Sequence, residues 1–93
     1  MTAPTLDAAF RIPDDVIFRE LDGEAVVLNL DTGIYFGLDA VGTRIWRLIE
    51  DRQPLKAVLE TLIDEYDAPP DRLQRDLLAF VERLNSKGLL SLS

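Results

Sequence analysis

Residues 26–46, VVLNLDTGIYFGLDAVGTRIW, decide the fold, because two extended stretches, a tight turn and the start of a helix follow one another with no linker between them. Side chains alternate between two faces in residues 24–30 and again in residues 34–38, as they do along β-strands. Residues 31–33, Asp-Thr-Gly, suit a three-residue hairpin loop, since Asp bonds to turn amides and Gly accepts a positive φ. The stretch therefore predicts a hairpin that leads directly into a helix.

A further strand is expected before this hairpin, at Val16 to Leu21. Asp22-Gly23 follows it and is a strong signal for a two-residue hairpin loop. The three strands then form an antiparallel meander, in which the first and third strands are edges.

Three helices are expected after the meander. Asp39 can cap the first helix, which ends near Glu50, and Pro54 suits the start of the second, which reaches Tyr66. The third helix runs from about Asp71 to Lys87. The expected apolar stripes are Val41, Ile45, Leu48 and Ile49, with Trp46 on their flank; Leu55, Val58, Leu59, Leu62, Ile63 and Tyr66; and Leu73, Leu77, Phe80, Val81 and Leu84.

Three smaller signals concern the helices. Asp71, with Gln74 three residues later, resembles a capping box. Gly88 suits the left-handed position that follows a helix. Gly42, inside the first helix, either lets another group approach closely or is simply tolerated at a cost of about 1 kcal/mol relative to Ala.

The order of elements predicts an α+β, winged-helix-like fold, with a three-stranded antiparallel sheet followed by three helices. Residues 1–13 carry two prolines and no sustained period, so we expect a flexible N-terminal arm there, either mobile or loosely docked, and one domain over residues 14–93.

Composition argues against an enzyme. The 93 residues include no cysteine and no histidine, which removes disulfides, thiolate nucleophiles, the usual general base and the commonest metal ligands. We therefore expect no catalytic residue, no metal site and no cofactor.

The charge balance limits the partners. The formal net charge is −7, whereas nucleic-acid binding depends on Lys and Arg, and the third helix mixes acidic with basic residues. No apolar run approaches the roughly 18 residues of a membrane span, and the N-terminus lacks the pattern of a signal peptide. We expect a cytoplasmic protein that binds neither nucleic acid nor membrane, with a protein or peptide partner.

The third strand is the candidate functional element. Edge strands are usually protected by Lys, Pro or an inward charge, and residues 34–38, IYFGL, have none of these. Two interpretations remain open from the pattern: the chain's own tail or N-terminal arm covers this edge, or an extended peptide adds to it as a further strand.

The stretches LNLDTGIYFGLDAVGTRIWRLIE (residues 28–50) and PLKAVLETLIDEYDAPPDRLQRDLLAFVERLNSKGLL (residues 54–90) resemble the PqqD-like proteins, the RiPP recognition elements that bind leader peptides of ribosomally made precursors. The similarity covers residues 15–92. It implies a leader that docks antiparallel to the third strand, in a groove between that strand and the third helix. The Gly33-Ile34-Tyr35-Phe36 stretch is most similar to the freestanding leader-binding proteins of lasso-peptide biosynthesis.

The resemblance also implies a set of peptide-binding residues. Main-chain pairing would come from the third strand, and the facing wall from one flank of the third helix. The predicted set is Ile34, Tyr35, Phe36, Gly37, Leu38, Gln74, Arg75, Leu78, Val81 and Arg83. The helix could instead present its other flank, Asp76, Phe80 and Arg83, and the sequence leaves this choice open.

The leading hypothesis is a non-catalytic protein that binds a precursor leader by strand addition and presents it to the leader peptidase and macrolactam synthetase of lasso-peptide maturation. The alternatives are a winged-helix DNA-binding regulator, a PqqD-type chaperone for a radical-SAM peptide-modifying enzyme, and a small structural subunit held to an enzyme through its apolar edge.

Overall fold

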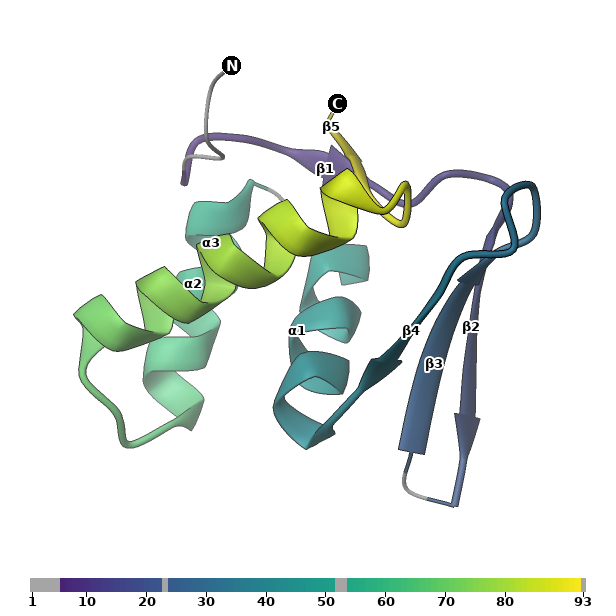
Figure 1. Ribbon diagram of the computed structural model, residues 1–93. Helices are drawn as coiled ribbons and strands as arrows, with labels where there is room; N and C mark the ends of the chain where they lie inside the picture. Colours follow the sequence, from purple (N-terminus) through teal and green to yellow (C-terminus); the bar gives the residue numbers. More distant parts are fainter. Residues whose placement is uncertain (1–5, 23, 52–53, 93) are drawn as a thin grey trace.

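The computed structural model describes residues 6–22, 24–51 and 54–92, and Figure 1 draws its fold. Within these residues the strands are β1 (Phe10–Arg11), β2 (Val16–Leu21), β3 (Glu24–Asn29), β4 (Tyr35–Leu38) and β5 (Ser91–Leu92). The helices are α1 (Ala40–Asp51), α2 (Leu55–Glu65) and α3 (Pro70–Ser86).

The strands β2, β3 and β4 form an antiparallel sheet in that order, and the helices gather on one side of it (Figure 1). β1 and β5 pair with each other as a separate two-stranded sheet. The described residues therefore confirm the predicted α+β, winged-helix-like fold, with its three-stranded antiparallel sheet followed by three helices.

The hydrophobic core lies between the sheet and the helices, and Trp46 is among its most deeply buried side chains. Trp46 is 1% exposed and its ring stacks on Phe18, with 6.4 Å between the ring centroids. The prediction that placed Trp46 on the flank of the helix and Val41 in its apolar stripe is wrong, since Val41 is 45% exposed. Because α1 packs against both the sheet and α2, its buried surface is wider than one stripe. The buried residues are Gly42, Ile45, Trp46, Leu48 and Ile49.

The hairpin loop between β3 and β4 is held by Asn29 instead of Asp31. The Asn29 side-chain oxygen accepts hydrogen bonds from the main-chain N–H groups of Asp31 (2.8 Å) and Thr32 (3.1 Å), and its amide nitrogen donates to the Gly88 carbonyl (2.9 Å). Gly33 has the predicted positive φ, +78°. Asn29 is only 8% exposed, so one buried side chain fastens the loop to the end of α3.

The helix termini agree with the sequence in two places and differ in a third. Asp39 caps α1 as predicted, accepting from the Gly42 N–H at 2.7 Å, and Gly88 has the predicted positive φ, +74°. The capping box at Asp71 is wrong: α3 begins one residue earlier, at Pro70, after Pro69 and with no side-chain cap. Proline is tolerated there because the first helical N–H has no partner within the helix.

Residues 6–13 of the expected arm are docked on the domain, and residues 1–5 of it lie outside the described part. Phe10 is 3% exposed in the core. The carbonyls of Leu6 and Ala8 accept from the N–H groups of Lys56 (2.8 Å) and Leu55 (3.0 Å). These N–H groups belong to the first turn of α2 and have no acceptor within the helix. The arm therefore supplies the acceptors that the first turn of α2 lacks.

Over the described residues, no helix combines the length and apolar character that a membrane crossing requires.

We expect Asn29→Ala to lower the free energy of unfolding by about 2–3 kcal/mol, because three hydrogen bonds of about 1 kcal/mol each are lost. Urea denaturation measures the change. Asp31→Ala is the matched control in the same loop, and we expect it to change stability by less than about 0.5 kcal/mol. Equal losses in the two variants would contradict the role given to Asn29.

Candidate functional site

The outer edge of β4 is open among the described residues. β4 pairs with β3 on one side, and no described strand pairs with its other side. The described parts of the N-terminal arm and the tail do not cover it, because β1 and β5 pair with each other.

The main-chain groups that β4 leaves free follow from its register. Asn29 donates its N–H to the Ile34 carbonyl at 2.8 Å, so this pair is hydrogen-bonded across the hairpin. Bonded and non-bonded pairs alternate along antiparallel strands, so Phe36, two residues on, also faces β3. The N–H and C=O groups of Tyr35 and Gly37 therefore point outward along the open edge.

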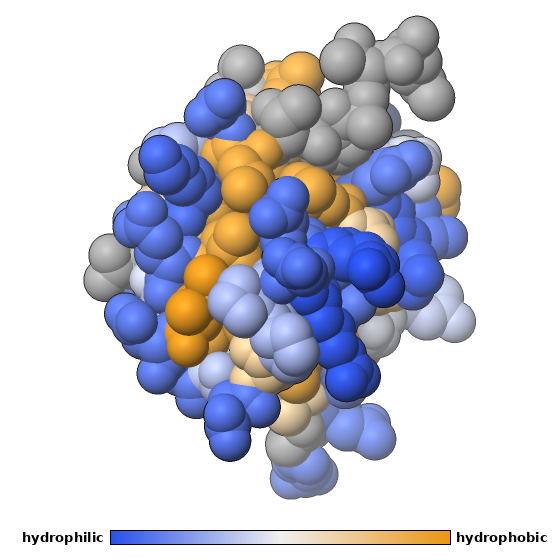
Figure 2. Space-filling view, turned by 90° about the vertical axis from the view of Figure 1, so that its left-hand side faces the viewer, coloured by the Kyte–Doolittle hydropathy of each residue, from blue (hydrophilic) through white to orange (hydrophobic). Residues whose placement is uncertain are grey.

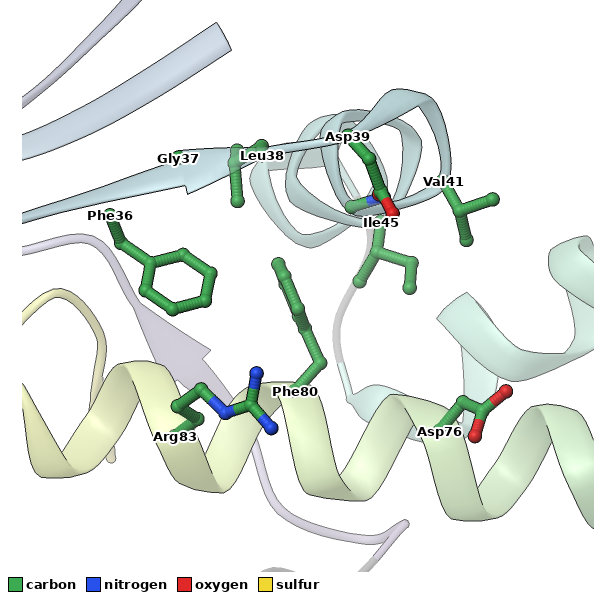
Figure 3. Close-up of a pocket in the computed structure, with 10 residues that line it drawn as sticks. Phe36, Gly37, Leu38, Asp39, Val41, Ile45, Asp76, Phe80 and Arg83 are labelled. Atoms are coloured by element: carbon green, nitrogen blue, oxygen red, sulfur yellow. The ribbon is translucent and has the colours of Figure 1, made fainter.

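A cleft of about 480 Å³ lies beside this edge, between β4, the start of α1 and α3 (Figure 3). Its residues come from the three elements that enclose it. They are Phe36, Gly37, Leu38, Asp39, Val41, Gly42, Ile45, Asp76, Phe80 and Arg83.

The walls of the cleft are mainly apolar and its charged groups stand at the rim. Phe36 and Phe80 are half-buried and extend toward each other from β4 and α3 (Figure 3). The guanidinium carbon of Arg83 lies 5.9 Å from the centroid of the Phe36 ring, within range of a cation–π interaction. Such a surface can hold an extended chain with apolar side chains.

Gly42 sets how closely α3 approaches α1. A Cβ atom at this position would lie 3.3 Å from Cε1 of Phe80 and 3.2 Å from Oδ1 of Asp39, which is tighter than ordinary contact. The close-approach interpretation of Gly42 therefore fits the structure, because the missing side chain makes room for the Phe80 ring.

The predicted site residues occupy three places. Phe36, Gly37, Leu38 and Arg83 line the cleft, next to Ile34 and Tyr35 on the same hairpin. Gln74, Arg75 and Leu78 line a separate hollow on α3 together with Asp71. Val81 is 0% exposed and belongs to the core, so it is not available to a ligand at the surface.

The flank of α3 that faces β4 is therefore the alternative one, Asp76, Phe80 and Arg83. Sequence reasoning omitted Asp39, Val41 and Ile45 from the site because their spacing indicated a cap and an apolar helix stripe. The exposure of Val41, at the start of α1, could not be read from the helical period.

A second hollow continues the cleft past α1. It has a volume of about 270 Å³ and shares Val41, Ile45 and Asp76 with the cleft. Leu62, Tyr66 and Leu73 add further apolar surface to it. On the face drawn in Figure 2, apolar side chains likewise form a stripe between hydrophilic ones.

The charged side chains that line the cleft are Asp39, Asp76 and Arg83. The described residues contain no group of three or more His, Cys, Asp or Glu side chains that could hold a metal ion. The pKa of Arg44 is raised, because its guanidinium donates to the Glu65 carboxylate, but this pair joins α1 to α2 and neither residue lines the cleft.

One protein-family model matches most of the chain. The model of the family described as "Coenzyme PQQ synthesis protein D (PqqD)" matches residues 24–90. No curated protein sequence matches the chain.

Two solved structures share the fold over nearly the whole chain. One is described as TbiB1 in complex with the TbiA(beta) leader peptide: it is 41% identical, with 86% of this chain and 93% of that chain covered and a TM-score of 0.79. The other is described as lasso peptide synthetase B1 complexed with the leader peptide: it is 25% identical, with 89% and 98% covered and a TM-score of 0.80. The resemblance drawn from the sequence is confirmed, and the chain belongs to the PqqD family.

Proposed function

We propose that this chain is a non-catalytic module that binds the leader segment of a ribosomally made precursor peptide by strand addition to β4. It would present the bound precursor to the leader peptidase and macrolactam synthetase of lasso-peptide maturation. The open edge of β4 beside an apolar cleft is the observation that carries this proposal. The two similar structures support it, because both are complexes with a leader peptide.

Strand addition would satisfy the outward main-chain groups of Tyr35 and Gly37. Such pairing supplies affinity without reading side chains, whereas pockets beside the strand supply specificity. Alternate side chains of the added peptide would point toward the helices, as those of Phe36 and Leu38 do, and enter the cleft. Micromolar to nanomolar binding corresponds to about 8 to 12 kcal/mol, which a short strand and two or three apolar anchors can provide.

The first experiment is a calorimetric titration with the leader peptide of the precursor encoded beside this gene, followed by amide chemical shifts. We expect saturable binding and shifts that concentrate at residues 35–38 and on the α3 flank of Asp76, Phe80 and Arg83. No binding at high micromolar concentration would contradict the proposal and favour a structural subunit. Steeply salt-dependent binding to duplex DNA would instead favour a winged-helix regulator.

We expect Gly37→Pro to abolish leader binding with little loss of stability, because proline removes an outward N–H and leaves the ladder to β3 intact. Gly37→Ala is the matched control: it keeps the N–H, and a Cβ there would meet nothing within 4 Å. Calorimetry measures the affinity and thermal unfolding checks the fold. Wild-type affinity in the folded proline variant would rule out strand addition at this position.

We expect Phe80→Ala to weaken leader binding by roughly 10- to 100-fold, because a central aromatic anchor of an interface typically contributes 1–3 kcal/mol. Leu78→Ala is the matched control on the same helix, since Leu78 is also half-buried but lines the separate hollow. Fluorescence polarisation with labelled leader separates the two. A larger effect of Leu78→Ala would move the binding surface to the flank favoured by the sequence.

A further inference from the structure

We propose that the cleft selects the charge order of its peptide: a basic side chain toward the N-terminus of the bound segment and an acidic one toward its C-terminus, with apolar residues between. This inference rests on the proposed function, and it adds the charge pattern of the peptide that the site accepts.

The two ends of the cleft carry opposite charges. Arg83 stands at the end where β4 begins, over the Phe36 ring. Asp76 stands at the other end, near Val41 and Ile45, and the Asp39 carboxylate lines that end too (Figure 3). The apolar contact surface of Phe36, Phe80 and Leu38 lies between them.

The polarity of the elements gives the peptide its direction. β4 runs from the Arg83 end toward the Asp76 end, and α3 runs the opposite way (Figure 3). The sheet is antiparallel throughout, so an added strand of the same kind runs against β4. The N-terminal part of the peptide then meets Asp76, and its C-terminal part meets Arg83, while the Asp39 carboxylate is already engaged as the cap of α1.

The spacing of the charges follows from helix and strand geometry. Asp76 and Arg83 are seven residues apart on α3, or roughly 10 Å at about 1.5 Å per residue. A strand rises about 3.3 Å per residue, and the side chains on one face are two residues apart. Long charged side chains can reach beyond the distance that separates Asp76 from Arg83. The basic and acidic residues of the peptide are therefore about four positions apart, with one apolar residue between them on the same face.

The charges at the rim are available to a ligand. Asp76 has one described ion pair, with Arg72 at 4.0 Å, and both side chains are largely exposed, 63% and 74%. Such a loose surface pair contributes little and is easily replaced. In the described residues Arg83 forms no ion pair within 4 Å, and its side chain contacts the Phe36 ring.

The test is selection of a displayed library of random 12-residue peptides on three forms of the full chain. These are the wild type, the swap variant Asp76→Lys/Arg83→Glu, and the control variant Arg75→Glu/Glu82→Lys. The control exchanges two opposite charges at the same seven-residue spacing on α3, and neither residue lines the cleft. Both variants keep the net charge, and thermal unfolding checks that each is folded.

We expect wild-type selection to enrich Lys or Arg about four positions before Asp or Glu, with apolar residues between. The swap variant should reverse that order, and the control variant should keep it. A selected peptide resynthesised with its two charges exchanged should bind the wild type roughly 5- to 30-fold more weakly, and raised salt should reduce this difference.

Three results would count against the inference. Enrichment of apolar residues without a charge order would overturn it, and so would the opposite order on the wild type, or an order that the swap variant does not change. Enrichment of no peptide on any form would contradict the proposed function itself, so the two failures are distinguishable.

Discussion

The pairing of β1 with β5 leaves the outer edge of β4 without a partner strand among the described residues. β1 and β5 bond to each other through their main chains, and the carbonyls of Leu6 and Ala8 accept hydrogen bonds from the first N–H groups of α2. These segments therefore cannot pair with β4 without breaking hydrogen bonds and exposing Phe10, which is 3% exposed in the core. An open strand edge is usually a hazard, and among the described residues β1 and β5 pair with each other and leave the edge of β4 open.

A short connection and close contacts join the elements that line the cleft beside that edge. Only Asp39 separates β4 from α1, and its side chain caps the helix that the strand leads into. On the opposite wall, the missing side chain of Gly42 lets the Phe80 ring approach α1. The shape of the cleft is thus set by core packing and one cap before any ligand arrives. A site that is preformed in this way loses little conformational entropy on binding. The entropic cost of binding then comes mainly from ordering the ligand.

Sequence reasoning located the three strands of the β2-β3-β4 sheet, the three helices, the Asp39 cap and the Gly88 terminus, because each depends on local chemistry within a few residues. It missed the features that depend on distant contacts. Asn29 looked like an ordinary strand residue, since its partner at Gly88 lies 59 residues away. Periodicity predicted an apolar stripe for α3 but not how that helix is turned about its own axis. The structure shows that Phe80, and not Leu78, faces β4. The burial of Phe10 in the core was not predicted, because short segments carry too little periodicity to indicate packing.

An open edge that receives a peptide could also receive the same edge of a second copy, and three properties of this chain oppose that pairing. β4 is only four residues long, which limits the hydrogen bonds that two such edges could share. The net charge of −7 makes two copies repel each other. In an antiparallel pair of β4 edges the helical layers would also compete for the space beside the strands. A short peptide without a helical layer avoids these costs, so the geometry that leaves β4 unprotected also favours a slender, extended partner over a folded one.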